Sequence, residues 1–238
     1  MFMNKILVVI PTYNEKDNIL KLISAIVDLD LSVLVVDDNS PDQTSNVVNN
    51  FFKNHKNVNV LKRKQKLGLG SAYRDGFNWG IKNNFNYLVE MDADFSHQVN
   101  DLKKMIEYKS ENRLVIGSRY IPGGEIVGWS KRRELLSKLA NKFVKFLSSS
   151  KVNDSTSGFR IYSKQVLEKI DYSKTTSNGY SFQIEMTLIA IDKEVDVIEV
   201  PITFLEREIG KSKMNYKIIL EALKYLIFLK FKKWFILK

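Results

Sequence analysis

Residues 87–97 read Y-L-V-E-M-D-A-D-F-S-H, an apolar run that ends in two carboxylates separated by one alanine. In an extended segment, residues i and i+2 point to the same side, so Asp92 and Asp94 face one spot and repel each other there. A positive group between them would relieve that repulsion. The local alternative is that aspartate follows strands because it starts turns and caps helices, and D-x-D also arises by chance. The surrounding sequence has to decide between the two.

Short apolar runs alternate with amphipathic stretches on both sides of this segment, which predicts an α/β fold with a mostly parallel sheet and helices on both faces. The expected strands are Lys5–Ile10, Val33–Val36, Val58–Lys62, Tyr87–Met91 and Leu114–Gly117. The expected helices are Glu15–Val27, Gln43–Asn54, Ser71–Lys82 and Asn100–Tyr108. Ligands of such open sheets bind outside the carboxyl ends of the strands.

Polar segments follow four of these strands, at the edge where a ligand is expected. They are P-T-Y-N-E at 11–15, D-D-N-S-P-D at 37–42, D-A-D at 92–94 and G-S-R-Y at 117–120. Capping accounts for Asn14, Ser40 and Ser96. It does not account for two pairs of acids beside Arg119, so the pattern favours a charged ligand site.

Composition limits the chemistry of that site. The 238 residues suit one α/β domain with an appendage. The chain has no cysteine and two histidines, which excludes disulfides, thiolate metal sites, cysteine nucleophiles and histidine-rich metal sites. A net charge of +10 indicates an anionic partner, either nucleic acid, a phosphorylated small molecule or an acidic membrane surface.

An acid pair without histidine or cysteine suits a hard cation such as Mg²⁺ or Mn²⁺, bound through carboxylate oxygens and completed by substrate phosphates. The positive group between Asp92 and Asp94 is then a metal that carries a diphosphate. The segment G-L-G-S-A-Y at 68–73 is a poor dinucleotide fingerprint, because it lacks the third glycine and follows the third strand. Its glycines are expected to let the backbone approach a ligand or turn into a helix.

Two amphipathic segments in the second half of the chain suggest a membrane surface. In the segment 129–147, apolar residues form one helical stripe with lysines along its flank. The stripe comprises Leu135, Leu136, Leu139, Phe143, Phe146 and Leu147, and the flank comprises Lys131, Lys138, Lys142 and Lys145. A helix on an anionic membrane and an ordinary core-packing helix both explain this pattern.

The C-terminal stretch from Ile218 is apolar almost all round. A spanning helix needs about 20 mostly apolar residues, and each central charge costs roughly 2.5–3.5 kcal/mol. Glu221 and four lysines interrupt the stretch. The sequence therefore predicts no transmembrane span but a basic interfacial helix over 214–238, following a catalytic domain over 1–213. The alternative is a terminal helix docked on the domain or on a partner subunit.

The N-terminus, M-F-M-N-K-I-L-V-V-I-P, enters a strand directly. Its apolar core is short and no small-residue cleavage site follows, so no signal peptide is expected. We therefore expect a peripheral protein on the cytoplasmic face of a membrane.

Seven motifs in order give a resemblance to a known family. They are V-V-I-P-T-Y-N-E, V-V-D-D-N-S-P-D, G-L-G-S-A-Y, M-D-A-D-F-S-H, V-I-G-S-R-Y, S-T-S-G-F-R-I-Y and R-E-I-G-K-S-K-M. Together they resemble inverting glycosyltransferases of the GT-A fold, and more narrowly the polyprenyl (dolichyl) phosphate mannose synthases, from about Ile6 to Met214. The ordered set is far more specific than D-x-D alone.

The resemblance implies roles for individual residues. For the nucleoside pocket it implies Pro11, Tyr13 and Glu15, with Asp37 or Asp38. For the metal and diphosphate it implies Asp92 and Asp94 with Ser96, which stands where some relatives carry glutamine. For the acceptor phosphate it implies Arg119, Arg133 and Ser137. Near the diphosphate it implies Arg207 and Lys213, and around the sugar it implies Ser157 to Arg160.

The implied reaction moves mannose from GDP-mannose to a polyprenyl or dolichyl phosphate, with Mg²⁺ or Mn²⁺ as cofactor. A lipid phosphate is already anionic, so it needs positioning and charge screening rather than a strong base. Arginine forks suit that task, with Arg119 and Arg133 as catalytic candidates beside the two acids.

Two alternatives stay open. One is transfer from UDP-glucose or another UDP-sugar, because the residues that select the base and sugar are not decisive. The other is a non-catalytic module that binds nucleic acid or membranes, which is disfavoured because the acidic edge repels a phosphate backbone. For the leading hypothesis, the partners considered besides donor, acceptor and membrane are a membrane-anchoring protein and a second copy of the chain (a homo-oligomer), and no nucleic-acid partner is expected.

Overall fold

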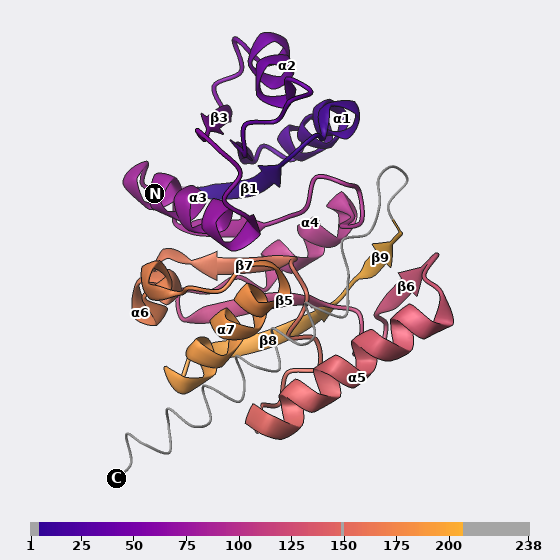
Figure 1. The fold of residues 1–238 in the computed structure, drawn as a ribbon. Coiled ribbons are helices and arrows are strands. Elements are labelled where there is room, and N and C mark those ends of the chain that lie inside the picture. The colour runs from indigo at the N-terminus through magenta and orange to yellow at the C-terminus, as the bar shows by residue number, and fades with distance from the viewer. Residues whose placement is uncertain (1–4, 149, 207–238) are drawn as a thin grey trace.

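The computed structural model describes residues 5–148 and 150–206. This part of the chain builds a seven-stranded sheet in the order β3-β2-β1-β4-β7-β5-β8 (Figure 1). The strands are β1 (Ile6–Thr12), β2 (Ser32–Asp37), β3 (Val58–Lys62), β4 (Tyr87–Glu90), β5 (Arg113–Ser118), β7 (Arg160–Ser163) and β8 (Asp196–Pro201). All neighbouring pairs are parallel except those of β7, which runs antiparallel between β4 and β5.

Helices connect and cover the strands. They are α1 (Lys16–Val27), α2 (Thr44–Phe51), α3 (Leu69–Lys82), α4 (Val99–Glu107), α5 (Lys131–Ser148), α6 (Lys164–Ile170) and α7 (Gly179–Asp192), with a short 3₁₀ turn at Tyr172–Lys174. A second, two-stranded sheet pairs β6 (Glu125–Val127) with β9 (Thr203–Leu205) beside α5.

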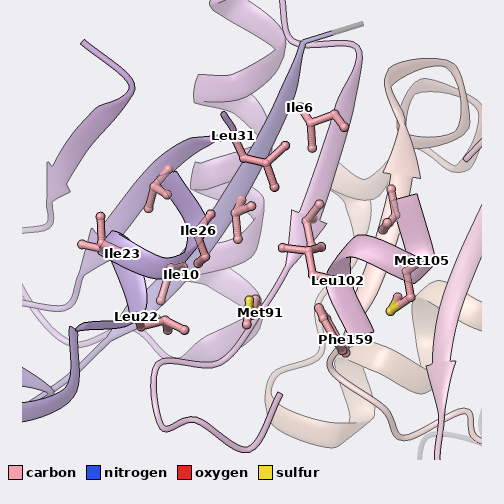
Figure 2. Close-up of a cluster of buried hydrophobic side chains, with 14 of the residues drawn as sticks. Ile6, Ile10, Leu22, Ile23, Ile26, Leu31, Met91, Leu102, Met105 and Phe159 are labelled. Atoms are coloured by element: carbon pink, nitrogen blue, oxygen red, sulfur yellow. The ribbon is translucent and has the colours of Figure 1, made fainter. Parts of the chain in front are cut away.

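Alternation along the strands produces two cores, one on each face of the sheet. In β1, Ile6, Val8 and Ile10 point to one face, and Leu7 and Val9 point to the other. The first face packs against α1 and α4, as Figure 2 shows for a set of labelled side chains. The second face packs against α3, α6 and α7. Burial on both faces explains why these strands are almost continuously apolar.

Glycines let α3 lie close to the sheet. A Cβ atom on Gly76 would lie 2.4 Å from Val9 Cγ1, and one on Gly80 would lie 2.5 Å from Leu88 Cδ2. Gly68 precedes the helix with φ +93°, a conformation that glycine adopts without strain. The expectation that glycines of the 68–73 segment turn the chain into a helix is therefore confirmed for Gly68.

The five expected strands and four expected helices are all present, with ends that agree to within three residues. The sequence pattern did not reveal that β7 is antiparallel and inserted between β4 and β5. That arrangement depends on contacts between distant segments, which periodicity does not report. The expected helix over 214–238 lies outside the described residues.

Candidate active site

A cavity of about 360 Å³ opens at the carboxyl ends of β1, β2 and β4. Seven of the residues expected from the sequence line it, namely Pro11, Tyr13, Glu15, Asp38, Asp92, Asp94 and Gly158. The cavity walls also include residues that the sequence did not single out, among them Lys66, Thr156, Asn178 and Gln183. The expectation that these polar strand ends meet at one edge of the sheet is confirmed.

The first wall of the cavity is held together by hydrogen bonds between the ends of β1 and β2. The Asn14 N–H donates to Ser40 Oγ at 3.0 Å, and the Glu15 N–H donates to Thr44 Oγ1 at 3.2 Å. Lys66 Nζ lies 3.5 Å from the centroid of the Tyr13 ring. A cation and an aromatic ring thus stand together on this wall.

Asp37 and Asp38 have different surroundings. Asp37 is completely buried and accepts hydrogen bonds from the Thr12 hydroxyl at 2.9 Å and the Ser40 backbone N–H at 3.1 Å. Asp38 pairs with Arg63 at 2.8 Å, accepts the Gly68 N–H and lines the cavity. Of the two acids that the sequence offered as candidates, Asp38 therefore lies on the cavity wall, whereas Asp37 supports the strand ends.

Hydrogen bonds from backbone N–H groups to nearby side chains hold the D-A-D turn. The Asp92 N–H donates to His97 Nδ1 at 3.1 Å, and the Ser96 N–H donates to Asp94 Oδ1 at 3.1 Å. Phe95 between them has φ 60°, which is strained for a bulky residue. Ser96 does not line the cavity, and its buried hydroxyl makes no hydrogen bond within the described residues. Its observed contact orients Asp94.

The donor set at this turn fits a hard divalent cation. Two carboxylates reach the cavity, and Mg²⁺ is commonly held by one or two carboxylates together with substrate phosphates and water. Among the residues that the structure describes, no three His, Cys, Asp or Glu side chains converge as a complete metal cage. A metal held by these two carboxylates would complete its coordination with phosphate oxygens and water.

A buried polar layer lies under the turn. Arg160 is completely buried and donates to the Ser157 carbonyl at 2.7 Å, the Ser155 carbonyl at 2.8 Å and Thr187 Oγ1 at 2.9 Å. It thus ties the loop before β7, which carries the cavity residues Thr156 and Gly158, to α7.

Glu90, at the end of β4, belongs to the same layer. Burial raises the pKa of Glu90 to about 8, although the Arg160 charge acts in the opposite direction. The burial of this carboxyl directly before the D-A-D turn was not expected from the sequence.

A second cavity, of about 670 Å³, lies between α5 and the loop that follows β5. Arg119, Lys138, Lys142 and Lys145 contribute its basic lining. Arg119 also forms a bidentate pair with buried Asp154, with both nitrogen–oxygen distances at 2.7 Å.

Thr156 relates this second cavity to the first. Arg119 Nη2 donates to Thr156 Oγ1 at 2.8 Å, and Thr156 lines the first cavity. Arg119 therefore stands at the junction of the two cavities.

The other residues expected around an acceptor phosphate lie nearby but line neither cavity. The Arg133 guanidinium stacks 3.8 Å over the Trp129 ring and pairs with Glu206 at 3.0 Å. Ser137 is buried next to Tyr120. Arg207 and Lys213 lie outside the described residues.

The helix α5 turns its apolar stripe to solvent. Leu135, Leu136, Leu139, Phe143 and Phe146 are all exposed. The opposite side of the helix, with Ser137, Asn141 and Val144, is buried. The core-packing alternative for these five residues is therefore wrong. No helix in the described ranges has the length and apolar character needed to cross a membrane.

Comparison with known proteins gives the family. Residues 7–171 match the family described as "Glycosyl transferase family 2". The chain belongs to this family. The glycosyltransferase is 44% identical to the polyprenol monophosphomannose synthase of Mycolicibacterium smegmatis, across 91% of its own length and 83% of that protein's length. It is 40% identical to the undecaprenyl-phosphate mannosyltransferase of Micrococcus luteus, across 92% and 90% of the two chains.

Solved structures agree on the fold of this glycosyltransferase. A mannosyltransferase from Pyrobaculum calidifontis, solved in complex with GDP-Man and Mn²⁺, aligns with a TM-score of 0.54 at 16% identity. The alignment covers 93% of this chain and 69% of that one. GalNAc-T7, solved with UDP, GalNAc and Mn²⁺, aligns with a TM-score of 0.58 at 13% identity, over 92% and 48% of the chains. The expected GT-A fold is confirmed.

Several site residues of the glycosyltransferase were missed in the sequence. Lys66 and Gln183 carry no motif, and they reach the first cavity from the loop before α3 and from α7. His97 was not assigned to the site, yet it contacts the Asp92 backbone. Of these residues, only His97 could have been found from the sequence, because it follows the D-A-D motif at close spacing.

Proposed function

We propose that this glycosyltransferase moves mannose from GDP-mannose to a polyprenyl or dolichyl phosphate at a membrane surface, with inversion at the sugar. The observation that carries the proposal is the meeting of Asp92 and Asp94 with Pro11, Tyr13 and Asp38 in one cavity. The names of the two relatives, at 44% and 40% identity, support mannose and a polyprenyl phosphate. An acidic cavity edge gives no support to a nucleic-acid partner.

The first cavity suits a nucleoside diphosphate sugar. Tyr13, Glu15 and Asp38 stand on the wall formed by β1 and β2, where the nucleoside would lie. Lys66, over the Tyr13 ring, supplies positive charge on the same wall. Asp92 and Asp94 would hold Mg²⁺ or Mn²⁺, which stabilises negative charge on the departing diphosphate.

The second cavity suits the acceptor phosphate. Arg119 and three lysines give it a positive lining, and Arg119 reaches Thr156 on the wall of the first cavity. An oxygen of the lipid phosphate forms a bond to the anomeric carbon while the bond from that carbon to the diphosphate breaks. The electron pair leaves with the nucleoside diphosphate. Attack opposite the leaving group gives a β-linked product from an α-linked donor.

No general base is required for this step, because the attacking phosphate is already an anion. The described residues instead position charges. Asp154 fixes the plane of the Arg119 guanidinium through two short hydrogen bonds. Arg133 and Ser137 stay proposed acceptor residues next to this cavity, and Arg207 and Lys213 stay proposed diphosphate residues.

The exposed face of α5 suits the surface of an anionic membrane. Five large apolar side chains project from it, and lysines of the same helix line the second cavity. The same proposal includes a peripheral position on the cytoplasmic face of the membrane. It also includes a catalytic domain over 1–213, an interfacial helix over 214–238, and an anchoring partner or a second copy of the chain.

Transfer of radiolabelled sugar tests the proposal. The protein is incubated with polyprenyl phosphate and either GDP-mannose or UDP-glucose, with Mg²⁺, with Mn²⁺ or with EDTA. Label that enters the organic-extractable lipid only with GDP-mannose and metal supports donor, acceptor and cation together. Label that enters the lipid only from UDP-glucose would show that the donor is a UDP-sugar and not GDP-mannose. Folded protein that labels the lipid from neither donor would overturn the acceptor assignment.

A further inference from the structure

Gln183 is a buried amide on the wall of the first cavity. Its side chain lies in α7, is 1% exposed and lines the cavity together with Asp92 and Gly158. The amide contacts the buried carboxyl of Glu90, and no other hydrogen-bond partner of either amide atom is found among the described residues. One carboxyl does not satisfy two N–H groups and a carbonyl oxygen, and buried polar groups are almost always paired, so the remaining capacity of the amide indicates a partner that arrives with a substrate.

The amide faces a small gap that a glycine keeps open. A Cβ atom placed on Gly158 would lie 3.7 Å from Gln183 Nε2 and 3.9 Å from Asp92 Oδ2, both ordinary contact distances. Gln183, Gly158 and Asp92 therefore surround one volume beside the D-A-D turn. In the strand order β1-β4-β7, Tyr13 follows β1 and Gly158 precedes β7, so the D-A-D turn after β4 separates this volume from Tyr13.

The chemistry of an amide selects among the parts of a sugar nucleotide. The phosphates are anions, for which Asp92 and Asp94 with a cation are suited. A neutral amide offers two donors and an acceptor, which suit a hydroxyl group that both donates and accepts. The part of the donor that carries hydroxyls and lies beyond the diphosphate from the nucleoside is the sugar.

We propose that Gln183 binds a hydroxyl of the donor sugar and thereby contributes to the choice of sugar. This inference rests on the proposed function for the existence of a sugar nucleotide, but it does not depend on the base. A polar site rejects a ligand that cannot pair with it, because its own buried groups are then left unsatisfied. Packing supports the orientation, since the neighbours Phe182 and Ile184 are buried and anchor this turn of α7.

Calorimetric titration of Gln183→Met with GDP-mannose and with GDP, each in Mn²⁺, tests the proposal. Methionine keeps the length of the side chain and removes its hydrogen bonds. We expect affinity for GDP-mannose to fall about tenfold while affinity for GDP stays unchanged. Gln165→Met is the matched control, because Gln165 is exposed on α6 and its variant should bind both ligands as the parent protein does.

If Gln183→Met lowers the affinity for GDP and for GDP-mannose equally, Gln183 maintains the shape of the pocket and does not contact the sugar. That result would overturn the proposal. Unchanged affinity for both would also overturn it. Gly158→Ala provides a second measurement if the first variant folds poorly, because its methyl group enters the gap at ordinary distances from the protein. The same selective loss of GDP-mannose supports the proposal, and an equal loss for both ligands, or none, contradicts it.

The design separates this proposal from the function on which it rests. UDP and UDP-glucose are titrated in parallel. If the parent protein binds only UDP and UDP-glucose, the proposed donor is wrong. The role of Gln183 is then tested by whether Gln183→Met lowers the affinity for UDP-glucose more than the affinity for UDP. If no sugar nucleotide binds more tightly than its nucleotide, and Gln183→Met changes neither, no sugar contact exists and the inference fails.

Discussion

Aspartates of this chain perform different tasks according to their neighbours. Asp37 is enclosed by hydroxyl and amide donors and holds two strand ends together. Asp154 is enclosed by one guanidinium. Asp92 and Asp94 reach a cavity that suits a cation. The residue type is the same in each case, and the local donors decide whether the carboxylate supports the structure or faces a ligand.

Asp94→Asn tests the cation site. Mutation of a residue that hydrogen-bonds a metal ligand lowers metal affinity or activity by about 10–100-fold. Loss of a proposed ligand itself should therefore lower metal-dependent transfer by about a hundredfold or more. Sugar transfer is measured against Mn²⁺ concentration, and the thermal midpoint checks that the fold is kept. Asp17→Asn, on the exposed side of α1, should leave transfer unchanged. Normal transfer by Asp94→Asn at normal metal concentration would remove Asp94 from the site.

Asp154→Asn tests the buried ion pair. Burial opposes ionisation of Asp154, but the Arg119 charge and its hydrogen bonds outweigh burial and hold the pKa of that carboxyl below its ordinary value. A buried guanidinium without its partner is costly, so we expect the free energy of unfolding to fall by about 3–5 kcal/mol. Urea unfolding at pH 7 measures this loss.

The sign of the pH dependence follows from the lowered pKa of Asp154. The pair's contribution is fully present above the unfolded-state pKa, about 3.9, and is lost as pH falls through the lower folded-state value. The parent protein should therefore lose more stability than Asp154→Asn between pH 5 and the acid limit of folding. Asp17→Asn is the control, since Asp17 is exposed on α1 and its variant should follow the acid curve of the parent protein. Parallel acid curves for the parent and Asp154→Asn would contradict this prediction.

At the scale of elements, the close approach of α3 to the sheet shapes the floor of the site. The helix begins at the cavity, with Gly68, Leu69 and Ala72 on its wall. Its glycines then bring it against β1 and β4. Because α3 also packs on Phe182 of α7 through Tyr73, it links the wall near β1 with the element that carries Gln183. Displacement of α3 therefore alters both ends of the cavity.

Gly76→Ala tests this packing. Alanine is the better helix former, so the substitution stabilises an exposed helix by roughly 0.5–1 kcal/mol. Here its methyl group would lie 2.4 Å from Val9 Cγ1, and overpacking of a core typically costs about 1–3 kcal/mol. We expect a net loss in the free energy of unfolding, measured with urea. Lys82→Ala, exposed on the same helix, should change it by less than about 0.5 kcal/mol. A stabilised Gly76→Ala would show that the helix shifts without cost.

At the scale of the whole molecule, an apolar helix face and positive charge occur together. The chain carries a net charge of +10, and α5 exposes five large apolar side chains beside a lysine-lined cavity. In Figure 1, α5 lies at the far end of the molecule from α2. A lipid phosphate bound at the second cavity could therefore stay attached to a membrane that contacts α5.

Phe146→Ser tests this orientation. Phe146 on α5 is 81% exposed, and Phe51 on α2 is 65% exposed, so Phe51→Ser is a matched control. Burial of a phenylalanine contributes about 1.5–3 kcal/mol, so loss of Phe146 should weaken flotation with phosphatidylglycerol vesicles about tenfold or more. Added salt should also weaken vesicle binding by the parent protein, because it screens the attraction between lysines and anionic lipid. Equal loss in both variants would show that α5 is not the membrane-facing helix.

Much of the fold could be predicted because it rests on local patterns. Apolar runs and amphipathic spacing indicated β1 to β5 and α1 to α4 within a few residues. The polar strand ends indicated the cavity edge, and seven expected residues line it. Lys66 and Gln183 were not predictable in this way, because a lone lysine or glutamine carries no spacing signal.

By itself, the sequence determined the α/β class, the edge of the sheet where the polar strand ends meet, the acid pair and the family resemblance. These depend on alternation, helical period and ordered motifs, which are written along the chain. Only the tertiary structure decided that β7 lies antiparallel between β4 and β5, that Asp38 rather than Asp37 faces the cavity, and that α5 exposes its apolar stripe. Those features depend on which distant segments pack together, because burial and partners are properties of the folded contacts and not of spacing.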